Sequence, residues 1–516
     1  MMTRKKLPIG IQNLREIREE GHYYVDKTGF ALKLINEGKH YFLSRPRRFG
    51  KSLFLDTLKE LFEGNAALFQ GLIAEQQWNW AVKYPVLRFS FGSGVFKNGD
   101  YLYQNLMAQL DELEAQAGYR SEYTTCPERF QTLIRHISQQ TAQPVVILID
   151  EYDKPILDAL EFPEIAKANR DFLRGFYSVI KNYDAHIKFS LLTGVSKFSK
   201  VSLFSGLNNL YDITLDYRYS AICGYTDQDI DTTFSAELAG LDREQIREWY
   251  NGYNWLGEGV YNPFDILQLF RHREFRNYWF ETGTPSFLIQ MFYQDKLSTP
   301  NLTQLTSDDE LLSSFDVNDM SVEALMFQTG YLTIKQRENI GGNYFYQLGY
   351  PNREVYQSLN ASLLQYLVQE GSNQVAQRIR LYKLLMQNKL AALEQLFHAF
   401  FASIPHQWYT KNTLANYEGY YASIFYSYFA ALGLNVTVED ATNQGRIDMT
   451  LQFNHHIYIF EFKVVELTPQ GAAMAQLKTK AYADKYRALQ QPIYLIGVEF
   501  SKQDRNIVAF AVEQVQ

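Results

Sequence analysis

Nine residues near the N-terminus have the pattern of a phosphate-binding loop, Ser44-Arg45-Pro46-Arg47-Arg48-Phe49-Gly50-Lys51-Ser52. In the motif G-x-x-x-x-G-K-[ST], backbone N–H groups wrap the phosphates, the lysine reaches the β and γ oxygens and the hydroxyl holds Mg²⁺. The last three residues match, whereas Arg45 replaces the first glycine. A strand-like run, 40–43, precedes the loop, and an amphipathic run, 53–58, follows it. The sequence therefore predicts strand, loop and helix; the alternative is a solvated basic turn before an ordinary helix.

A second segment favours the phosphate-binding interpretation. The apolar run 145–149 is typical of a strand buried on both faces, and Asp150 and Glu151 follow it. An acid at this strand end is placed to hold Mg²⁺ beside the loop, and the next acid can orient or deprotonate water. The alternative is an N-cap pair for a helix. A further strand, 186–192, delivers Thr193 to its carboxyl end, where the hydroxyl can sense the γ-phosphate or cap a turn.

Near the C-terminus, two acids and a lysine fall on a predicted β-hairpin. A strand begins at 445–449 and contains Asp448, and a returning strand at 457–463 alternates with period two, so Glu461 and Lys463 share one face. Pairing about the turn can bring the Asp448 carboxylate close to Glu461. Such a set suits divalent-metal phosphodiester cleavage. The alternative is a surface hairpin with an ordinary cross-strand ion pair.

Both groups resemble one family, the bacterial AAA-ATPase-like proteins that carry a C-terminal PD-(D/E)XK nuclease-like domain. The resemblance covers nearly the whole chain, and Arg45 in place of glycine is this family's own pattern. The matching segments occur in the family's order, at 7–10, 24–28, 45–52, 149–153, 192–196, 204–209, 250–253, 261–264, 327–332, 445–448 and 461–463.

For the ATPase part, the resemblance implies ATP and Mg²⁺ as ligands. Ser52 and Asp150 would hold the Mg²⁺, and Glu151 would activate water. Arg47 and Arg48 could add charge at the phosphates, with solvated or structural roles as the alternative. The residues expected to bind the nucleotide are Arg47, Arg48, Phe49, Gly50, Lys51, Ser52, Leu53, Asp150 and Thr193.

For the nuclease part, the resemblance implies a metal site built from three acids, Glu418, Asp448 and Glu461, with Lys463 as the motif lysine. The metal would be Mg²⁺, with Mn²⁺ as a substitute. Gln476 matches an additional polar position on the following helix. Related nucleases place a tyrosine four residues after this glutamine, whereas here that position is Lys480 and the tyrosine is Tyr482.

Composition sets further limits. The formal net charge of -7 argues against a protein that binds nucleic acid over most of its surface, so any contact with nucleic acid must be made by a local patch. Cys126 and Cys223 match no zinc spacing and suit a reducing cytosol. No apolar run reaches the length of a membrane span. We therefore expect a cytoplasmic protein without a membrane partner.

The expected fold class is α/β: a P-loop NTPase core, a helical lid, a small winged-helix-like unit and a C-terminal restriction-endonuclease-like (PD-(D/E)XK) domain. A chain of 516 residues has room for three or four such domains. The predicted bounds are an N-terminal lead at 1–36, the core at 37–215, the lid at 216–298, a linker (299–319) and winged-helix-like unit at 299–371, and the nuclease-like domain at 372–516.

Two hypotheses about function follow. The first is an enzyme in which ATP binding and hydrolysis govern a Mg²⁺-dependent nuclease in the same chain, with DNA expected rather than RNA and a homo-oligomer as one allowed state. The second is a nucleotide-gated binding or signalling scaffold, whose nuclease fold is inactive or only grips nucleic acid or a partner. The intact set of Glu418, Asp448, Glu461 and Lys463 favours the first.

Overall fold

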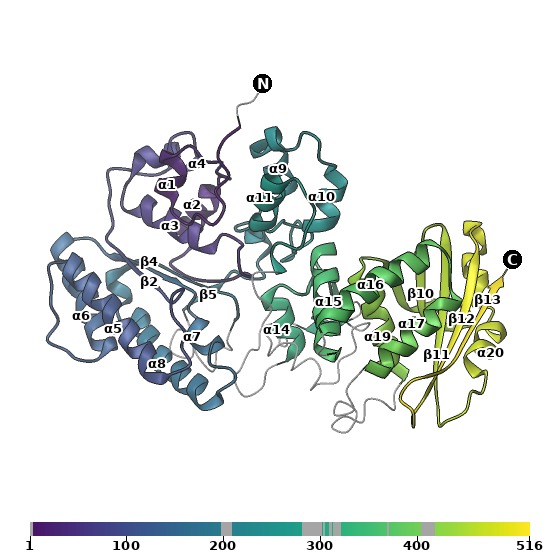
Figure 1. The fold of residues 1–516 in the computed structure, drawn as a ribbon. Coiled ribbons are helices and arrows are strands. Elements are labelled where there is room, and N and C mark those ends of the chain that lie inside the picture. The colour runs from purple at the N-terminus through teal and green to yellow at the C-terminus, as the bar shows by residue number, and fades with distance from the viewer. Residues whose placement is uncertain are drawn as a thin grey trace. The chain divides into compact units, whose positions relative to one another are not determined.

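A computed structural model describes residues 4–197, 209–280, 302, 305–308, 312, 321–368, 371–403 and 418–515. The chain divides into two compact units. The first is Met1–Gly283 with Leu305–Asn352, and the second is Thr284–Gln304 with Arg353–Gln516. Figure 1 shows helices and a β-sheet in each unit.

The first unit is built on a parallel five-stranded sheet with the order β2-β3-β4-β1-β5. Every residue of β1 and β3 is buried, as expected for strands that contain the apolar runs 41–43 and 145–149. The strands predicted around 40–43, 145–149 and 186–192 are therefore confirmed. The strands are β1 (His40–Ser44), β2 (Val86–Ser90), β3 (Val145–Asp150), β4 (Ile187–Gly194) and β5 (Tyr211–Asp212).

The strand order gathers the predicted phosphate loop and acids at one edge. Because β4 lies between β1 and β3 and all three are parallel, their carboxyl ends meet at the same edge. Leu43 of β1 pairs with Thr193 of β4, and Ile149 of β3 pairs with Leu192.

Helices cover both faces of this sheet, with α1–α4 on one side and α5–α8 on the other (Figure 1). The helices are α1 (Leu14–Glu19), α2 (Thr28–Glu37), α3 (Lys51–Phe62), α4 (Ile73–Gln77), α5 (Gly99–Gln116), α6 (Cys126–Thr141), α7 (Lys154–Leu157) and α8 (Pro163–Asn182). Short 3-10 turns lie at η1 (Ala66–Phe69) and η2 (Asp184–His186).

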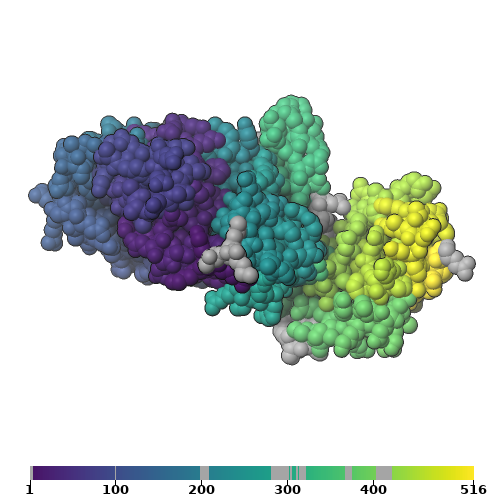
Figure 2. All heavy atoms as spheres, turned by 90° about the horizontal axis from the view of Figure 1, so that it is seen from above, coloured from purple at the N-terminus to yellow at the C-terminus, as the bar shows by residue number. Residues whose placement is uncertain are grey.

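The helical segment after the sheet packs on the N-terminal lead. Tyr23 and Val25 share a buried cluster with Ile230, Phe234 and other apolar residues of the segment. Figure 2 shows the contact, with purple N-terminal residues beside teal ones. The elements are η3 (Tyr217–Tyr219), α9 (Asp227–Thr233), η4 (Ser235–Glu237), α10 (Arg243–Tyr250) and α11 (Pro263–His272).

A small antiparallel sheet, ordered β6-β8-β7, completes the first unit. β7 and β8 form a hairpin, and both turn residues, Gly341 and Gly342, have positive φ as a tight hairpin turn requires. The linker expected at 299–319 lies largely outside the described residues. The elements are β6 (Thr306–Asp308), α14 (Val322–Thr329), β7 (Thr333–Ile340) and β8 (Asn343–Gly349).

The second unit holds a mixed sheet with the order β13-β12-β11-β10-β9. All neighbours are antiparallel except β11 and β12, which are joined by a crossover through α20. The helices are α15 (Arg353–Val368), α16 (Gly371–Met386), α17 (Ala391–Ser403), α19 (Glu418–Ala431) and α20 (Ala472–Thr479), with the 3-10 segment η8 (Tyr482–Leu489). The strands are β9 (Asn435–Thr442), β10 (Gly445–Phe453), β11 (His456–Val465), β12 (Ile493–Ser501) and β13 (Ile507–Val515).

The predicted C-terminal hairpin is confirmed as β10 and β11. Phe453 pairs with His456, and the turn residues Asn454 and His455 both have positive φ. An aromatic core holds the helices on this sheet; Phe397 and Phe425 stack with ring centroids 3.8 Å apart. The parallel first sheet and the mixed second sheet confirm the expected α/β fold class. Within the described ranges, no helix combines the length and apolar character needed to cross a bilayer.

Candidate functional site

The predicted phosphate loop joins β1 to α3. Gly50 is the residue before the helix and has a φ of 92°, in the region that favours glycine. Its left-handed conformation turns the chain so that the first turn of α3 begins at Lys51, with Ser52 next. The N-terminal N–H groups of a helix are free to bind an anion. The loop thus ends in a local structure suited to phosphate.

Lys51 folds back on its own loop. Its Nζ donates hydrogen bonds to the carbonyl oxygens of Arg45 (2.8 Å) and Pro46 (2.9 Å), and its side chain is buried. Burial lowers the pKa of Lys51, and the Asp150 carboxylate opposes this shift. Phosphate oxygens are acceptors of the same kind as these two carbonyls.

Residues of the helical segment hold the loop from behind. Phe49 is buried and makes edge-on ring contacts with Tyr253 and Trp255, at 4.8 and 5.4 Å between centroids. The carbonyl of Arg47 accepts a hydrogen bond of 3.1 Å from the indole Nε1 of Trp279. These contacts fix the loop on the helical segment.

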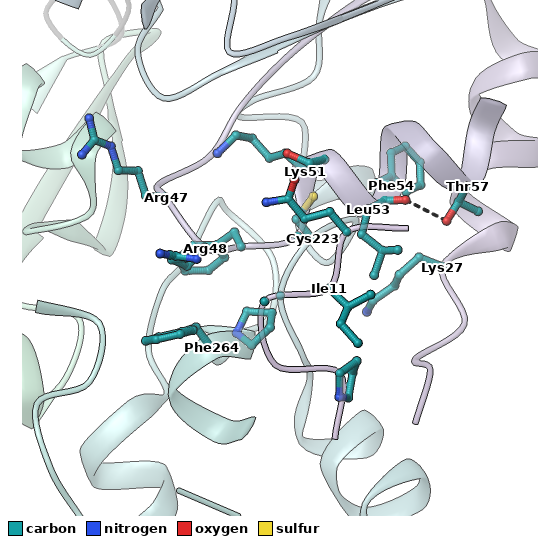
Figure 3. Close-up of a pocket in the computed structure, with 18 of the residues that line it drawn as sticks. Ile11, Lys27, Arg47, Arg48, Lys51, Leu53, Phe54, Thr57, Cys223 and Phe264 are labelled. Atoms are coloured by element: carbon teal, nitrogen blue, oxygen red, sulfur yellow. Dashed lines mark hydrogen bonds between the residues drawn. The ribbon is translucent and has the colours of Figure 1, made fainter. Parts of the chain in front are cut away.

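Arg47 and Arg48 of the loop are exposed and differ in surroundings. The Arg48 guanidinium lies over the ring of Phe264, 5.0 Å from its centroid, whereas Arg47 extends away from Lys51 (Figure 3). Arg48 also has a φ of 68°. Neither guanidinium is buried, so both remain available to an anion.

Asp150 and Thr193 meet at the ends of adjacent strands. Thr193 Oγ1 donates a 2.9 Å hydrogen bond to Asp150 Oδ1, and both side chains are buried. Glu151 follows with a φ of 52°, which non-glycine residues adopt at a cost of about 1–3 kcal/mol. Burial, and then the charge of Asp150, raises the pKa of Glu151. A carboxylate with a raised pKa is a better proton acceptor.

The sequence analysis did not assign Asp153, which braces this edge. Its Oδ2 accepts hydrogen bonds from the backbone N–H groups of Val195 (3.0 Å) and Ser196 (2.6 Å) and from Ser196 Oγ (2.6 Å). Tyr152 adds a bond from its hydroxyl to the Ser196 carbonyl. Burial raises the pKa of Asp153. The sequence feature that could have identified Asp153 is its position, three residues after Asp150 and just past the end of the strand.

A cavity of about 580 Å³ opens in front of the loop (Figure 3). Its volume is in the range of small-molecule sites. Of the residues expected to bind nucleotide, Asp150 and Thr193 lie behind the cavity wall, while Arg47, Arg48, Phe49, Gly50, Lys51, Ser52 and Leu53 line it. Glu151 and Asp153 also line it.

The N-terminal lead forms the opposite wall of the cavity, a role that the sequence analysis missed. Residues 8, 10–12 and 23–25 line it, together with Tyr225 and Leu267 from the helical segment. Lys27 also lines the wall and pairs with Asp229 at 2.8 Å. Only the tertiary fold brings these segments to the loop, so no local pattern could reveal them.

In the second unit, Asp448, Glu461 and Lys463 lie at the end of the β10–β11 hairpin away from its turn. Lys463 Nζ lies 3.2 Å from Glu461 Oε1, so these two side chains do share a face. Asp448 Oδ2 accepts a 2.8 Å hydrogen bond from the backbone N–H of Phe462. Glu461 is fully buried. The hairpin therefore gathers two acids and a lysine.

Tyr482 joins this group although its spacing differs from the related nucleases. Its hydroxyl is hydrogen-bonded to Gln476, and its pKa is raised by burial and then by the charges of Glu461 and Asp448. A Cβ added at Gly445, whose φ is 148°, would meet the Tyr482 hydroxyl at 3.0 Å. Tyr482 thus closes one side of the group.

Glu418 is the first residue of α19, and its side chain lies outside the described residues. Among the side chains that are described, no three His, Cys, Asp or Glu residues cluster closely enough to hold a metal ion. Asp448 and Glu461 supply two carboxylates, the type of ligand that Mg²⁺ and Mn²⁺ prefer.

Comparison with known proteins agrees with both halves of the chain. The family described as "Predicted AAA-ATPase" matches residues 8–204, and the PD-(D/E)XK nuclease superfamily matches residues 416–510. A protein of Azotobacter chroococcum mcd 1, named "Uncharacterized protein in vnfD 5'region", is 59% identical over 516 residues, which is the whole of both chains. The chain belongs to the predicted AAA-ATPase family and carries a C-terminal domain of the PD-(D/E)XK nuclease superfamily.

Proposed function

We propose that the first unit binds and hydrolyses ATP and that its nucleotide state governs a Mg²⁺-dependent nuclease in the second unit. The observation that carries this proposal is the cavity of about 580 Å³, which has Lys51, Ser52 and Glu151 along one wall. The lysine that binds phosphate, the serine that binds the metal and the glutamate that acts as general base would thus face the same cavity.

In the ATP site, each residue has a distinct task. Lys51 would exchange its two carbonyl acceptors for phosphate oxygens, and the first N–H groups of α3 would bind the same anion. Ser52 and Asp150 would hold the Mg²⁺, which neutralises phosphate charge when bound. Apolar residues of the N-terminal lead and Leu267 would hold the adenine ring of the nucleotide.

Glu151 would accept the proton of the attacking water. Its left-handed backbone turns the side chain toward the cavity, and its raised pKa increases its basicity. Asp153, bound to the loop after β4, would keep this backbone in place.

In the nuclease site, Asp448 and Glu461 would hold a divalent ion, with Glu418 as a third ligand. That ion lowers the pKa of a bound water and offsets charge on the phosphate. Lys463, which pairs with Glu461, would turn to the scissile phosphate. The expected substrate is nucleic acid, DNA rather than RNA.

The nucleotide assignment is tested by thermal unfolding. Mg·ATP should raise the unfolding temperature of the parent, since a ligand that binds only the folded state stabilises it. Lys51→Ala should abolish the shift. The matched control is Lys59→Ala, on the same helix but absent from the cavity wall, and it should keep the shift. Equal shifts in parent and Lys51→Ala would refute the assignment.

The nuclease assignment is tested by incubating the full chain with Mg²⁺ or Mn²⁺, with and without ATP, against single- and double-stranded DNA and RNA. Metal-dependent cleavage that changes with ATP supports the coupled enzyme. Binding without cleavage under every condition would instead support the nucleotide-gated scaffold.

A further inference from the structure

Arg45, which replaces the first glycine of the phosphate loop, carries its charge into the protein interior. The side chain is 0% exposed and is among the largest fully buried ones. Its Nη1 donates to the carbonyls of Ser44 (2.8 Å) and Thr214 (3.0 Å), and its Nη2 donates to that of Tyr219 (3.2 Å). The guanidinium carbon lies 4.0 Å from the ring centroid of Trp255.

No carboxylate neutralises this charge among the described residues. The partners of the guanidinium are carbonyl dipoles and an aromatic face, and its Nε has no hydrogen-bond partner there. Besides Cys223, the group whose charge raises the pKa of Arg45 is Asp212, which pairs with Lys197. Burial lowers the pKa of Arg45 to about 10, so the group stays protonated at neutral pH. Such a buried, uncompensated charge is costly unless something offsets it.

The charge lies directly behind the phosphate loop. The carbonyl oxygen of Arg45 is one of the two acceptors of Lys51 Nζ, so backbone and side chain of the same residue connect the buried charge to the phosphate-facing amine. Arg45 itself is not part of the cavity wall, so it does not touch a ligand there. Its charge nevertheless acts at the cavity wall: burial raises the pKa of Cys223, which lines the cavity, and the charge of Arg45 opposes this shift. Salt screens such a buried charge much less than an exposed one.

We propose that Arg45 is a buried counter-charge for the polyphosphate chain: it raises nucleotide affinity through its field, in proportion to the number of phosphate charges bound in front of the loop. This inference rests on the proposed ATP-binding function. It explains why a loop position that elsewhere needs no side chain is filled by a cation with neutral partners. If Arg45 only stabilised the fold, its hydrogen bonds would be needed but its charge would not.

The experiment is calorimetric titration of the full chain with ATP, ADP, AMP and adenosine at fixed ionic strength. Arg45→Gln keeps an amide donor and removes the charge. Arg45→Lys keeps the charge and loses the planar guanidinium with its several N–H donors. For Arg45→Gln we expect about tenfold weaker ATP binding, a smaller loss for ADP and AMP, and unchanged adenosine binding. Tenfold is the effect of one pair of unit charges roughly 12 Å apart at an effective dielectric of about 20. Arg45→Lys should keep the phosphate-dependent gradient even if its unfolding temperature falls.

The control is Arg129→Gln. Arg129 is buried like Arg45 but pairs with Glu114 and Asp111, so its removal should alter stability without altering the nucleotide series. Equal losses for ATP and adenosine in Arg45→Gln would overturn the inference and mean that Arg45 only stabilises the fold. The inference would also be overturned if Arg45→Lys binds adenosine but no longer binds ATP more tightly than ADP and AMP. This outcome can be read even if Arg45→Gln does not fold. A parent that binds adenosine but not ATP would overturn the proposed function and this inference together.

Discussion

Gly194 provides a direct test of the brace at the carboxyl edge of the first sheet. A Cβ added there would lie 2.5 Å from Asp153 Oδ1 and 2.5 Å from the Tyr152 ring. Both neighbours are fixed: Tyr152 is fully buried against Phe42 and bonded to Ser196, and Asp153 holds the loop after β4. Because neither can yield cheaply, Gly194→Ala should destabilise the first unit by about 2–3 kcal/mol, the upper part of the range for overpacking.

The loss should appear in scanning calorimetry as a fall of about 5 °C in the unfolding temperature of the first unit. ATP hydrolysis should fall further than ATP binding, since Tyr152 and Asp153 directly follow Glu151 and its left-handed backbone. The matched control is Gly175→Ala, in α8, where an added Cβ meets nothing within 4 Å. This change should be neutral or stabilise by up to about 1 kcal/mol, as alanine favours a helix. A Gly194→Ala protein as stable as the parent would refute the brace.

Three further outcomes are expected. Glu151→Gln should keep ATP binding but lower hydrolysis by about 10²-fold or more. In the parent, hydrolysis should slow at low pH as Glu151 becomes protonated, and this loss should begin at higher pH than for an ordinary glutamate because the pKa of Glu151 is raised. Glu151→Gln should lack this pH-dependent loss, and hydrolysis rates measured over a pH series check both outcomes. Gly445→Ala should lower nuclease activity about tenfold, with ATP hydrolysis unchanged, because the new Cβ displaces Tyr482; unaltered cleavage would count against Tyr482. Asp448→Ala, Lys463→Ala and the double variant should share one residual cleavage rate, whereas additive losses would mean independent roles.

The elements that carry the proposed ATP site could be predicted because each has a strong local pattern. The run before Asp150 is buried throughout, and this burial on both faces is what a continuous apolar sequence encodes. Likewise, Gly50 ends the loop because only glycine adopts its φ of 92° without strain. In both cases one segment of sequence contains the whole physical cause.

The environment of Arg45 could not be predicted in the same way. The sequence shows a cation in a glycine position, but its burial depends on carbonyls at Thr214 and Tyr219 and on the ring of Trp255, all more than 160 residues later. A basic turn in solvent and a buried cation have the same local sequence. The difference lies in segments that meet only in the folded chain.

The position of Tyr482 shows why a motif spacing can fail while the contact survives. A helix that continued past Gln476 would place residue 480 one turn further along the same face. Here α20 ends at Thr479, and Ala481 takes a left-handed φ of 47° before η8 begins. This break redirects the chain, so that Tyr482 reaches Gln476 and the charges of Asp448 and Glu461. A spacing rule holds only while the helix that defines it continues, and here the helix ends at Thr479, before the tyrosine.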